Sequence, residues 1–368
     1  MRPRRFHVLI LGAVVLGVGL ASAQAQEDHS MHRAHGYQGH DMPMPPPDEL
    51  GRRRMGMDMR DMLSEDVIAG LKEKIALYGL LTDNELRINV AQMGENYTWY
   101  VSDANVRDEV GVLVLSHGVS EAGDRIMTDS MRAIAGEFPT AIGYGMAMMT
   151  SSHMQAAIDD LEAAGARTIV LVQTTSTVHN SMTRQWEYIL GRRDESSYLT
   201  VKPIETGAKI VFAPHMDDHP LIAGILSDHA LEISTEPDNE ALFLVAHGPE
   251  DDFDNELDLP VIESLAEQVK AATGISEVRA INLQDDAIPP VREGNVRQLK
   301  RWMQQAQRKG KKLIVVSPAS SADGLQHHIK QDLIGLDYTF NEKGLSQHPN
   351  FTEWVVTTVK QQAAALHN

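Results

Sequence analysis

Two short segments of the chain resemble each other, and each ends in a histidine that could do chemistry. His117 lies in GVLVLSHG at residues 111–118, and His247 lies in ALFLVAHG at residues 241–248. An apolar run that ends in His-Gly and precedes a helical pattern is typical of a parallel strand buried on both faces. Open α/β sheets bind their ligands at the carboxyl ends of such strands, so each imidazole is expected at a binding edge.

A second histidine follows the third expected strand of each half. It is His179 in the first half and His328 in the second, with the neighbouring His327 as an alternative. Because parallel strands end on one edge of a sheet, both imidazoles of a half are expected to face one crevice. Two neutral imidazoles can bind a divalent transition metal or accept protons near neutral pH. A single histidine is more often structural, and it is the recurrence in both halves that favours a functional role.

Carboxylates follow both strand-end histidines and could complete a metal site. The chain has no Cys, so a metal must bind to His, Met, carboxylate or backbone oxygen. Glu121 and Asp124 follow His117, and we expect both to be metal ligands beside it. The carboxylates after His247 are Glu250, Asp251, Asp252 and Asp254.

Strands alternate with helices in both halves, which predicts βαβ units around a parallel sheet. The fold class is therefore α/β, with two parallel-sheet lobes related by internal duplication. Strands are expected at 111–117, 141–149, 167–173, 209–214, 241–247, 278–283 and 311–317, and helices at 64–81, 123–136, 151–165, 259–272 and 291–309.

The 368 residues suffice for two domains and additional segments. We expect a signal peptide at 1–25, a disordered tail rich in His and Met at 26–62, and an N-terminal helical extension at 63–108. The two lobes are then expected at 109–236 and 237–368.

The signal peptide is predicted from a basic start with three arginines, an apolar core at 8–20, and ASA or AQA cleavage sites within 21–25. The alternative is an uncleaved membrane anchor, for which the apolar run is short. We therefore expect export to a bacterial periplasm and no stable membrane insertion after the signal is removed.

The tail has no periodicity that would bury a core, which predicts an extended, disordered segment. Imidazole and thioether groups bind copper and other later transition metals, so one interpretation is that the tail captures metal ions. The other is a polar linker. Its histidines are His29, His32, His35 and His40, and its methionines include Met42, Met44, Met55, Met57, Met59 and Met62.

The formal net charge of −18 argues against nucleic acid or anionic lipid as a partner and favours the attraction of cations. The acidic segment HMDDH at 215–219 has two interpretations. Two histidines four apart around two aspartates could bind a metal. Prolines on both sides favour the other interpretation, a hinge between the lobes.

The order of these motifs resembles the class II chelatases, particularly the sirohydrochlorin cobaltochelatases. Besides the strand-plus-HG motif, the likeness lies in SSHMQAAIDDLEAAGARTIVLV at 151–172, GLQHHIKQDL at 324–333 and LSQHP at 345–349. The resemblance covers roughly residues 108–350. It implies two Rossmann-like lobes, a lyase that inserts cobalt, nickel or iron into a tetrapyrrole, and a link to cobalamin biosynthesis, with no organic cofactor.

By position, His117 and His179 match the histidine pair of the family's first lobe. His247 and His328 match that of the second, because Asp332 follows His328 at the usual family distance. The resemblance makes these four histidines the expected catalytic and metal-binding residues.

The chain is therefore expected to be an exported metallochelatase that inserts a divalent metal, Co²⁺ first and Ni²⁺ or Fe²⁺ next, into a sirohydrochlorin-type tetrapyrrole. The alternative is a periplasmic metal- or tetrapyrrole-binding protein on the same scaffold without catalysis.

Overall fold

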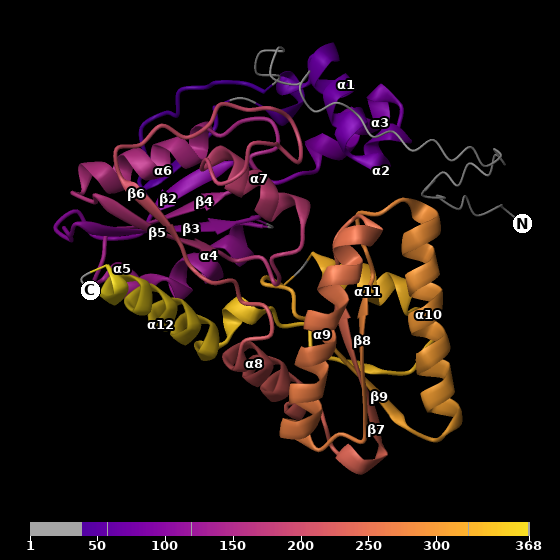
Figure 1. Ribbon diagram of the computed structural model, residues 1–368. Helices are drawn as coiled ribbons and strands as arrows, with labels where there is room; N and C mark the ends of the chain where they lie inside the picture. The colour runs from indigo at the N-terminus through magenta and orange to yellow at the C-terminus, as the bar shows by residue number, and fades with distance from the viewer. Residues whose placement is uncertain (1–38, 57, 119, 323, 367–368) are drawn as a thin grey trace, which may run out of the picture. The chain divides into compact units, whose positions relative to one another are not determined.

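The computed structural model describes residues 39–56, 58–118, 120–322 and 324–366, all within one compact unit (Figure 1). The expected signal peptide, and the tail as far as residue 38, lie outside the described residues. Among the helices of these ranges, none has the length and apolar character that crossing a membrane requires.

The first sheet is built around the strand that precedes His117. That strand is buried along its whole length and pairs with a parallel strand on each side. Two further strands, which the sequence did not predict, extend one edge in antiparallel pairing. In spatial order the strands are β1 (Arg52–Arg54), β2 (Tyr97–Tyr100), β4 (Thr140–Tyr144), β3 (Val110–Ser116), β5 (Thr168–Gln173) and β6 (Lys209–Phe212).

The second sheet has four strands, and all of its pairings are parallel. The strand that precedes His247 is again fully buried and lies between two neighbours, as in the first sheet. The predicted class, α/β with two parallel-sheet lobes, is confirmed. In spatial order the strands are β10 (Thr339–Phe340), β9 (Lys312–Val316), β7 (Glu240–Ala246) and β8 (Glu277–Asn282).

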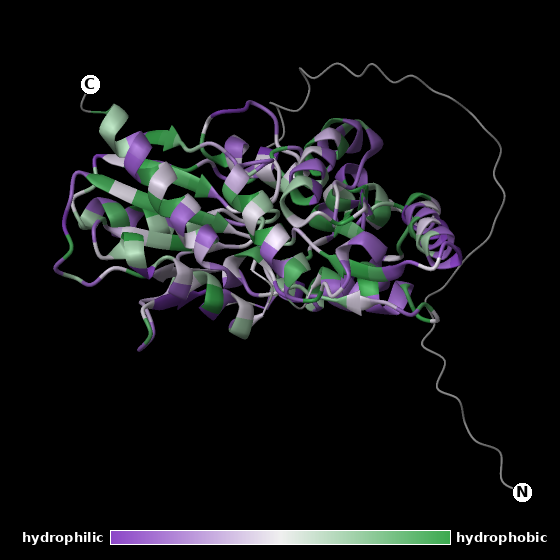
Figure 2. Cartoon of the chain, turned by 90° about the horizontal axis from the view of Figure 1, so that it is seen from below, coloured by the Kyte–Doolittle hydropathy of each residue, from purple (hydrophilic) through white to green (hydrophobic). Residues whose placement is uncertain are grey.

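Amphipathic helices connect the strands, and Figure 2 shows mostly hydrophobic strands beside helices that carry both hydrophobic and hydrophilic residues. The predicted helix at 64–81 is divided in two, and so is the one at 123–136. The helices are α1 (Glu65–Lys74), α2 (Ala76–Gly79), α3 (Asp83–Ala91), α4 (Glu121–Ser130), α5 (Arg132–Ala135), α6 (Ser152–Ala163), α7 (Ser181–Ile189), α8 (Pro220–Leu231), α9 (Asp252–Thr273), α10 (Pro289–Arg308), α11 (Leu325–Asp332) and α12 (Pro349–Ala365), with short 3₁₀ turns η2 (Met59–Met62), η3 (Pro237–Asn239) and η4 (Leu345–Gln347).

Strand β4 is shorter than the predicted 141–149 because the backbone turns at its end. Gly145 has φ 127°, which favours glycine, and Ala147 has φ 54°, a left-handed conformation that alanine rarely adopts. Residues 145–149 therefore form a loop rather than the end of the strand.

Two helices pack against the lobe opposite to the one in which the sequence analysis expected them. Helix α8, expected in 109–236, contacts α9 and β9 of the second lobe. Helix α12, expected in 237–368, contacts α4, α5 and β5 of the first lobe (Figure 1). Phe351 and Trp354 are fully buried in that contact. The chain thus crosses between lobes twice, because each helix buries its apolar face against the other half.

Within the expected disordered tail, the structure describes residues 39–56 and 58–62, which we call the strap. Strand β1 extends the first sheet by pairing with β2. The backbone amides of Gly39 and His40 donate to the oxygens of Thr200 and Met149, at 3.2 and 2.8 Å. The prediction of a segment without packing therefore does not hold for the strap, because its methionines fill gaps in the first lobe and need no periodicity to do so.

Met62, at the end of the strap, is fully buried. We expect Met62→Ala to lower the free energy of unfolding by about 2–5 kcal/mol, since it removes buried apolar volume. Denaturant unfolding followed by circular dichroism measures this loss. Leu50→Ala is the control in the same segment: Leu50 is 47% exposed, and its truncation should change stability by no more than about 0.5 kcal/mol. Equal effects of the two changes would mean that the strap does not pack as described.

Candidate metal and substrate site

His117 and His247 occupy equivalent turns in the two lobes. Each follows a buried central strand and is itself exposed. The following glycines, Gly118 and Gly248, have φ 78° and 71°, so both turns use the left-handed backbone that glycine permits. In each turn Nδ1 of the histidine lies at hydrogen-bonding distance from the carbonyl oxygen of that glycine. When Nδ1–H donates to this oxygen, Nε2 carries the lone pair that can accept a proton or bind a metal.

Asp286 pairs with one of these histidines and is influenced by the charge of the other. Its Oδ2 lies 3.4 Å from Nε2 of His247. Desolvation would raise the pKa of the Asp286 carboxyl, but the charge of His247 lowers it below its ordinary value, with a smaller contribution in the same direction from His117. The strand-end histidines of both lobes therefore act on one carboxylate.

The same contact makes His247 a stronger base. Desolvation would lower its pKa, but Asp286 and Asp285 outweigh this and raise the pKa to about 10. The side chains of His247 and Asp286 are 45% and 63% exposed, yet enough protein surrounds them to desolvate both. Side chains that are partly accessible to solvent and yet desolvated are typical of a crevice.

His328 is the second-lobe histidine that joins this site, whereas His327 only lies edge-to-face beside it. Nδ1 of His328 lies 2.5 Å from Oδ2 of Asp285, a contact that raises the pKa of His328. Asp285 also accepts from Nε of Arg292 at 2.8 Å. Burial would raise the pKa of the Asp285 carboxyl, but these partners lower it to about 2. The carboxylate thus stays ionised and orients His328.

His179 lies half-buried in the loop before α7, where its neighbours come from other elements. Its charge acts to lower the pKa values of Asp258 and His215, although burial is the largest influence on both. His219 caps α8: its Nδ1 accepts a hydrogen bond from the backbone amide of Leu221 at the start of that helix. This supports the hinge interpretation of residues 215–219.

Glu121 and Asp124, expected as ligands beside His117, have other partners. Glu121 accepts from Arg52 at 3.2 Å, and the buried Asp124 accepts from the Tyr97 hydroxyl at 2.7 Å. No group of three His, Asp or Glu side chains within the described ranges is arranged to hold a metal. The structure therefore does not assemble the expected ligand set, because both carboxylates serve the antiparallel edge of the first sheet.

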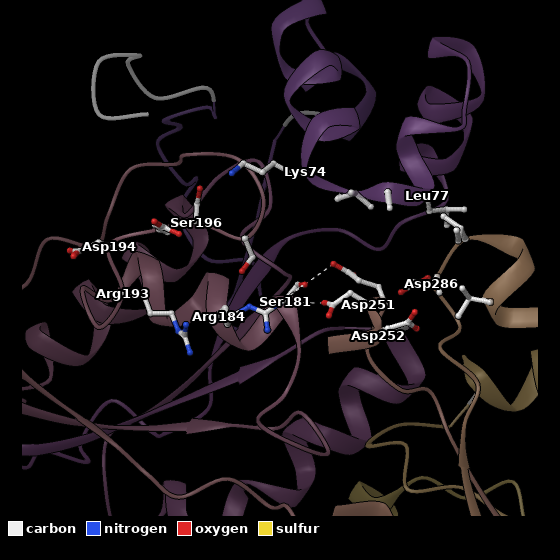
Figure 3. A pocket seen from close by; sticks show the side chains of 18 residues that line it. Lys74, Leu77, Ser181, Arg184, Arg193, Asp194, Ser196, Asp251, Asp252 and Asp286 are labelled. Carbon is white, nitrogen blue, oxygen red and sulfur yellow. Dashed lines mark hydrogen bonds and ion pairs between the residues drawn. The ribbon is translucent and has the colours of Figure 1, made fainter. Parts of the chain in front are cut away.

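A cavity of about 740 Å³ lies beside Asp286, within the range of small-molecule sites. Figure 3 shows Lys74, from the end of α1, on the opposite side of the cavity from Arg184 and Asp252. Ser181 donates to Glu250 at 2.6 Å across the lobes. The carboxyl groups of its lining are those of Asp194, Glu195, Glu250, Asp251, Asp252 and Asp286.

Sequence reasoning named Glu250 to Asp254 as candidates but missed Asp285 and Asp286. A signal was present, because the pair Asp285–Asp286 follows closely on the second strand of the second half, at the same sheet edge as His247. Glu250 is perturbed as well: desolvation raises its pKa.

No protein-family model and no curated protein sequence matches this chain. The architecture is the class II chelatase fold. SirB from Bacillus subtilis with Fe³⁺ superposes with a TM-score of 0.52 at 14% identity, over 71% of this chain and 98% of that chain. The sirohydrochlorin chelatase SirB from Bacillus subtilis subspecies spizizenii in complex with cobalt has a TM-score of 0.49 at 11% identity, over 70% and 96%. DR2241 from Deinococcus radiodurans has 0.42 at 13% identity, over 68% and 55%.

We expect Asp286→Asn to lower the pKa of His247 by about one to three pH units, because a carboxylate at this distance favours the imidazolium. The measurement is the pH titration of the His247 ring proton by NMR. Asp252→Asn, on the same cavity, is the matched control and should leave that titration nearly unchanged. An unaltered His247 pKa in Asp286→Asn would show that the ion pair does not control this histidine.

Proposed function

We propose that this protein is a metallochelatase that inserts a divalent metal, Co²⁺ first and Ni²⁺ or Fe²⁺ next, into a sirohydrochlorin-type tetrapyrrole. The observation that carries the proposal is that His117 and His247 occupy equivalent exposed turns of the two lobes, with His247 3.4 Å from Asp286, which lines the cavity. The chelatase fold supports it, and so do the Fe³⁺ and cobalt named for the two SirB structures.

In this mechanism the incoming metal forms bonds to the pyrrole nitrogens while the N–H bonds of those nitrogens break. The displaced protons pass to Nε2 of His117, which must be neutral to accept them, whereas His247, whose pKa is raised to about 10, can accept one only after releasing the proton that it already holds. Asp286 stabilises the imidazolium that forms, and Asp285 does the same for His328.

The charged groups that line the cavity favour binding of the metal cation over binding of the macrocycle. Six carboxyl groups line it, and they attract cations. A sirohydrochlorin-type macrocycle carries carboxylates, for which Lys74 and Arg193 are basic partners in the lining. Because the pKa of His247 is raised, its imidazole is protonated near neutral pH, and a metal that binds there must displace that proton. Affinity for Co²⁺ is therefore expected to rise with pH.

The second candidate is a periplasmic metal- or tetrapyrrole-binding protein on this scaffold. The acidic lining of the cavity, which attracts cations whether or not insertion follows, suits it. Capture of metal ions by the His- and Met-rich segment at 26–62 would suit either candidate. Turnover separates them: a binder takes up metal or tetrapyrrole stoichiometrically, with no insertion rate above background.

Replacing His117 or His247 with Ala should reduce the rate of Co²⁺ insertion into sirohydrochlorin by about 10²–10⁴-fold, since each change removes a proton acceptor. The double variant should lose little more, because groups that act together are not additive. The absorption change on insertion measures the rate, and the same measurement on His179→Ala and His328→Ala ranks the lobes. His327→Ala, next to the site, is the control and should keep full activity. Activity that falls only in step with melting temperature would make these imidazoles structural.

We also propose that the protein is exported and acts in the periplasm, which rests on the basic start and apolar core of residues 1–25. Mass spectrometry of the protein from its native host should give a mature start near Gln24 or Gln26. An intact Met1 on a membrane-bound protein would contradict this.

A further inference from the structure

The N-terminal helical extension forms one wall of the cavity beside Asp286. Helix α1 ends at Lys74, and Ile75 then adopts an extended backbone, with φ −115° and ψ 108°, before α2 begins at Ala76. The break between the two helices brings residues 74–77 into the lining of the cavity, and we call these four residues the cavity wall. The resemblance to the chelatases begins only at about residue 108, so the cavity wall lies outside it.

Buried side chains fix the cavity wall to the first lobe. Leu71 is fully buried, and together with Ile75 and Tyr78 it belongs to the apolar cluster that contains residues of β3. Tyr78 also senses the second lobe: burial raises its pKa, and the charges of Asp286 and Glu250 raise it further. The extension therefore packs on one lobe and lies near the carboxylates of the other.

Three basic side chains line the cavity, and two of them already have acidic partners. Arg184 contacts Asp254, and Arg193 contacts Glu187. Lys74 is exposed and has no ion-pair partner within the ranges that the structure describes. Its ammonium group is therefore available to an anionic group of a ligand.

Apolar side chains from two elements lie beside this cation. Ala76 and Leu77 come from the cavity wall, and the other apolar side chains of the lining come from residues 287–291, where α10 begins. Figure 3 shows Lys74 and Leu77 across the cavity from Arg184. Ligand pockets hold a ligand mainly through apolar contacts and orient it through a few polar groups, which suits a flat apolar ring with carboxylates on its edge.

We propose that the N-terminal extension recognises the macrocycle: Ala76 and Leu77 contact its ring, and Lys74 binds one of its peripheral carboxylates. This inference rests on the proposed function, because it takes the ligand to be a tetrapyrrole. The six carboxyl groups of the lining repel the carboxylates of the macrocycle, so the acidic edge of the ring turns toward the unpaired cation. The extension thereby sets the orientation of the ring and selects macrocycles with a carboxylate at that edge.

The test is a titration of the full chain with metal-free sirohydrochlorin, followed by the absorption of the macrocycle. Lys74→Gln should weaken binding by about tenfold, because it removes a hydrogen bond between charged groups, and Lys74→Arg should keep most of the affinity. Added salt should weaken binding to the wild type more than binding to Lys74→Gln. Lys72→Gln is the matched control on the same helix: Lys72 pairs with Asp83 at 2.5 Å and does not line the cavity, so this change should leave binding unaltered.

The apolar contact has its own pair of variants. Leu77→Asn should weaken binding of the macrocycle, whereas Leu80→Asn should not, because Leu80 is 63% exposed and lies outside the lining. Equal affinity of the wild type and Lys74→Gln for the macrocycle would overturn the proposal. An equal loss of affinity in Lys72→Gln would do the same, since the effect would then come from net charge alone.

The titration contains no metal, so its outcome is separate from the chelatase activity. In insertion assays Lys74→Gln should raise KM for the macrocycle rather than lower kcat, and its affinity for Co²⁺ should not fall. Binding that depends on Lys74 in a protein that never inserts metal would refute the chelatase function and leave this inference intact. A wild type that does not bind the macrocycle would overturn both.

Discussion

Burial of the two central strands on both faces is the constraint on which the rest of the structure depends. Strands β3 and β7 are buried at every residue, so neither can carry a polar functional group along its length. The first place where each strand can present one is the turn at its carboxyl end, where His117 and His247 stand. Parallel pairing then sets the neighbouring strand ends beside them, which is why Asp285 and Asp286 come within reach.

Charge pairing sets the protonation of the side chains at these strand ends. Asp285 is buried and stays ionised because His328 and Arg292 contact it, while Asp286 pairs with His247. The result is two imidazoles with raised pKa values, those of His247 and His328, beside an acidic cavity that attracts cations.

The strap adds a second environment with the opposite character. It carries methionines into an apolar cluster of the first lobe, whereas the cavity beside Asp286 gathers carboxylates.

The sequence by itself determined the seven strands predicted above, the duplication and the positions of His117 and His247, because apolar runs ending in His-Gly are local patterns. It also named His328, which the structure places against Asp285. Glu121 and Asp124, expected beside His117, instead contact Arg52 and Tyr97, which an unpredicted antiparallel edge brings to them. Only the tertiary structure decided that Asp286 reaches His247, that α8 and α12 pack on the opposite lobes, and that the strap packs on the first lobe. Each of these depends on contacts between residues far apart in the chain, and no local periodicity records such contacts.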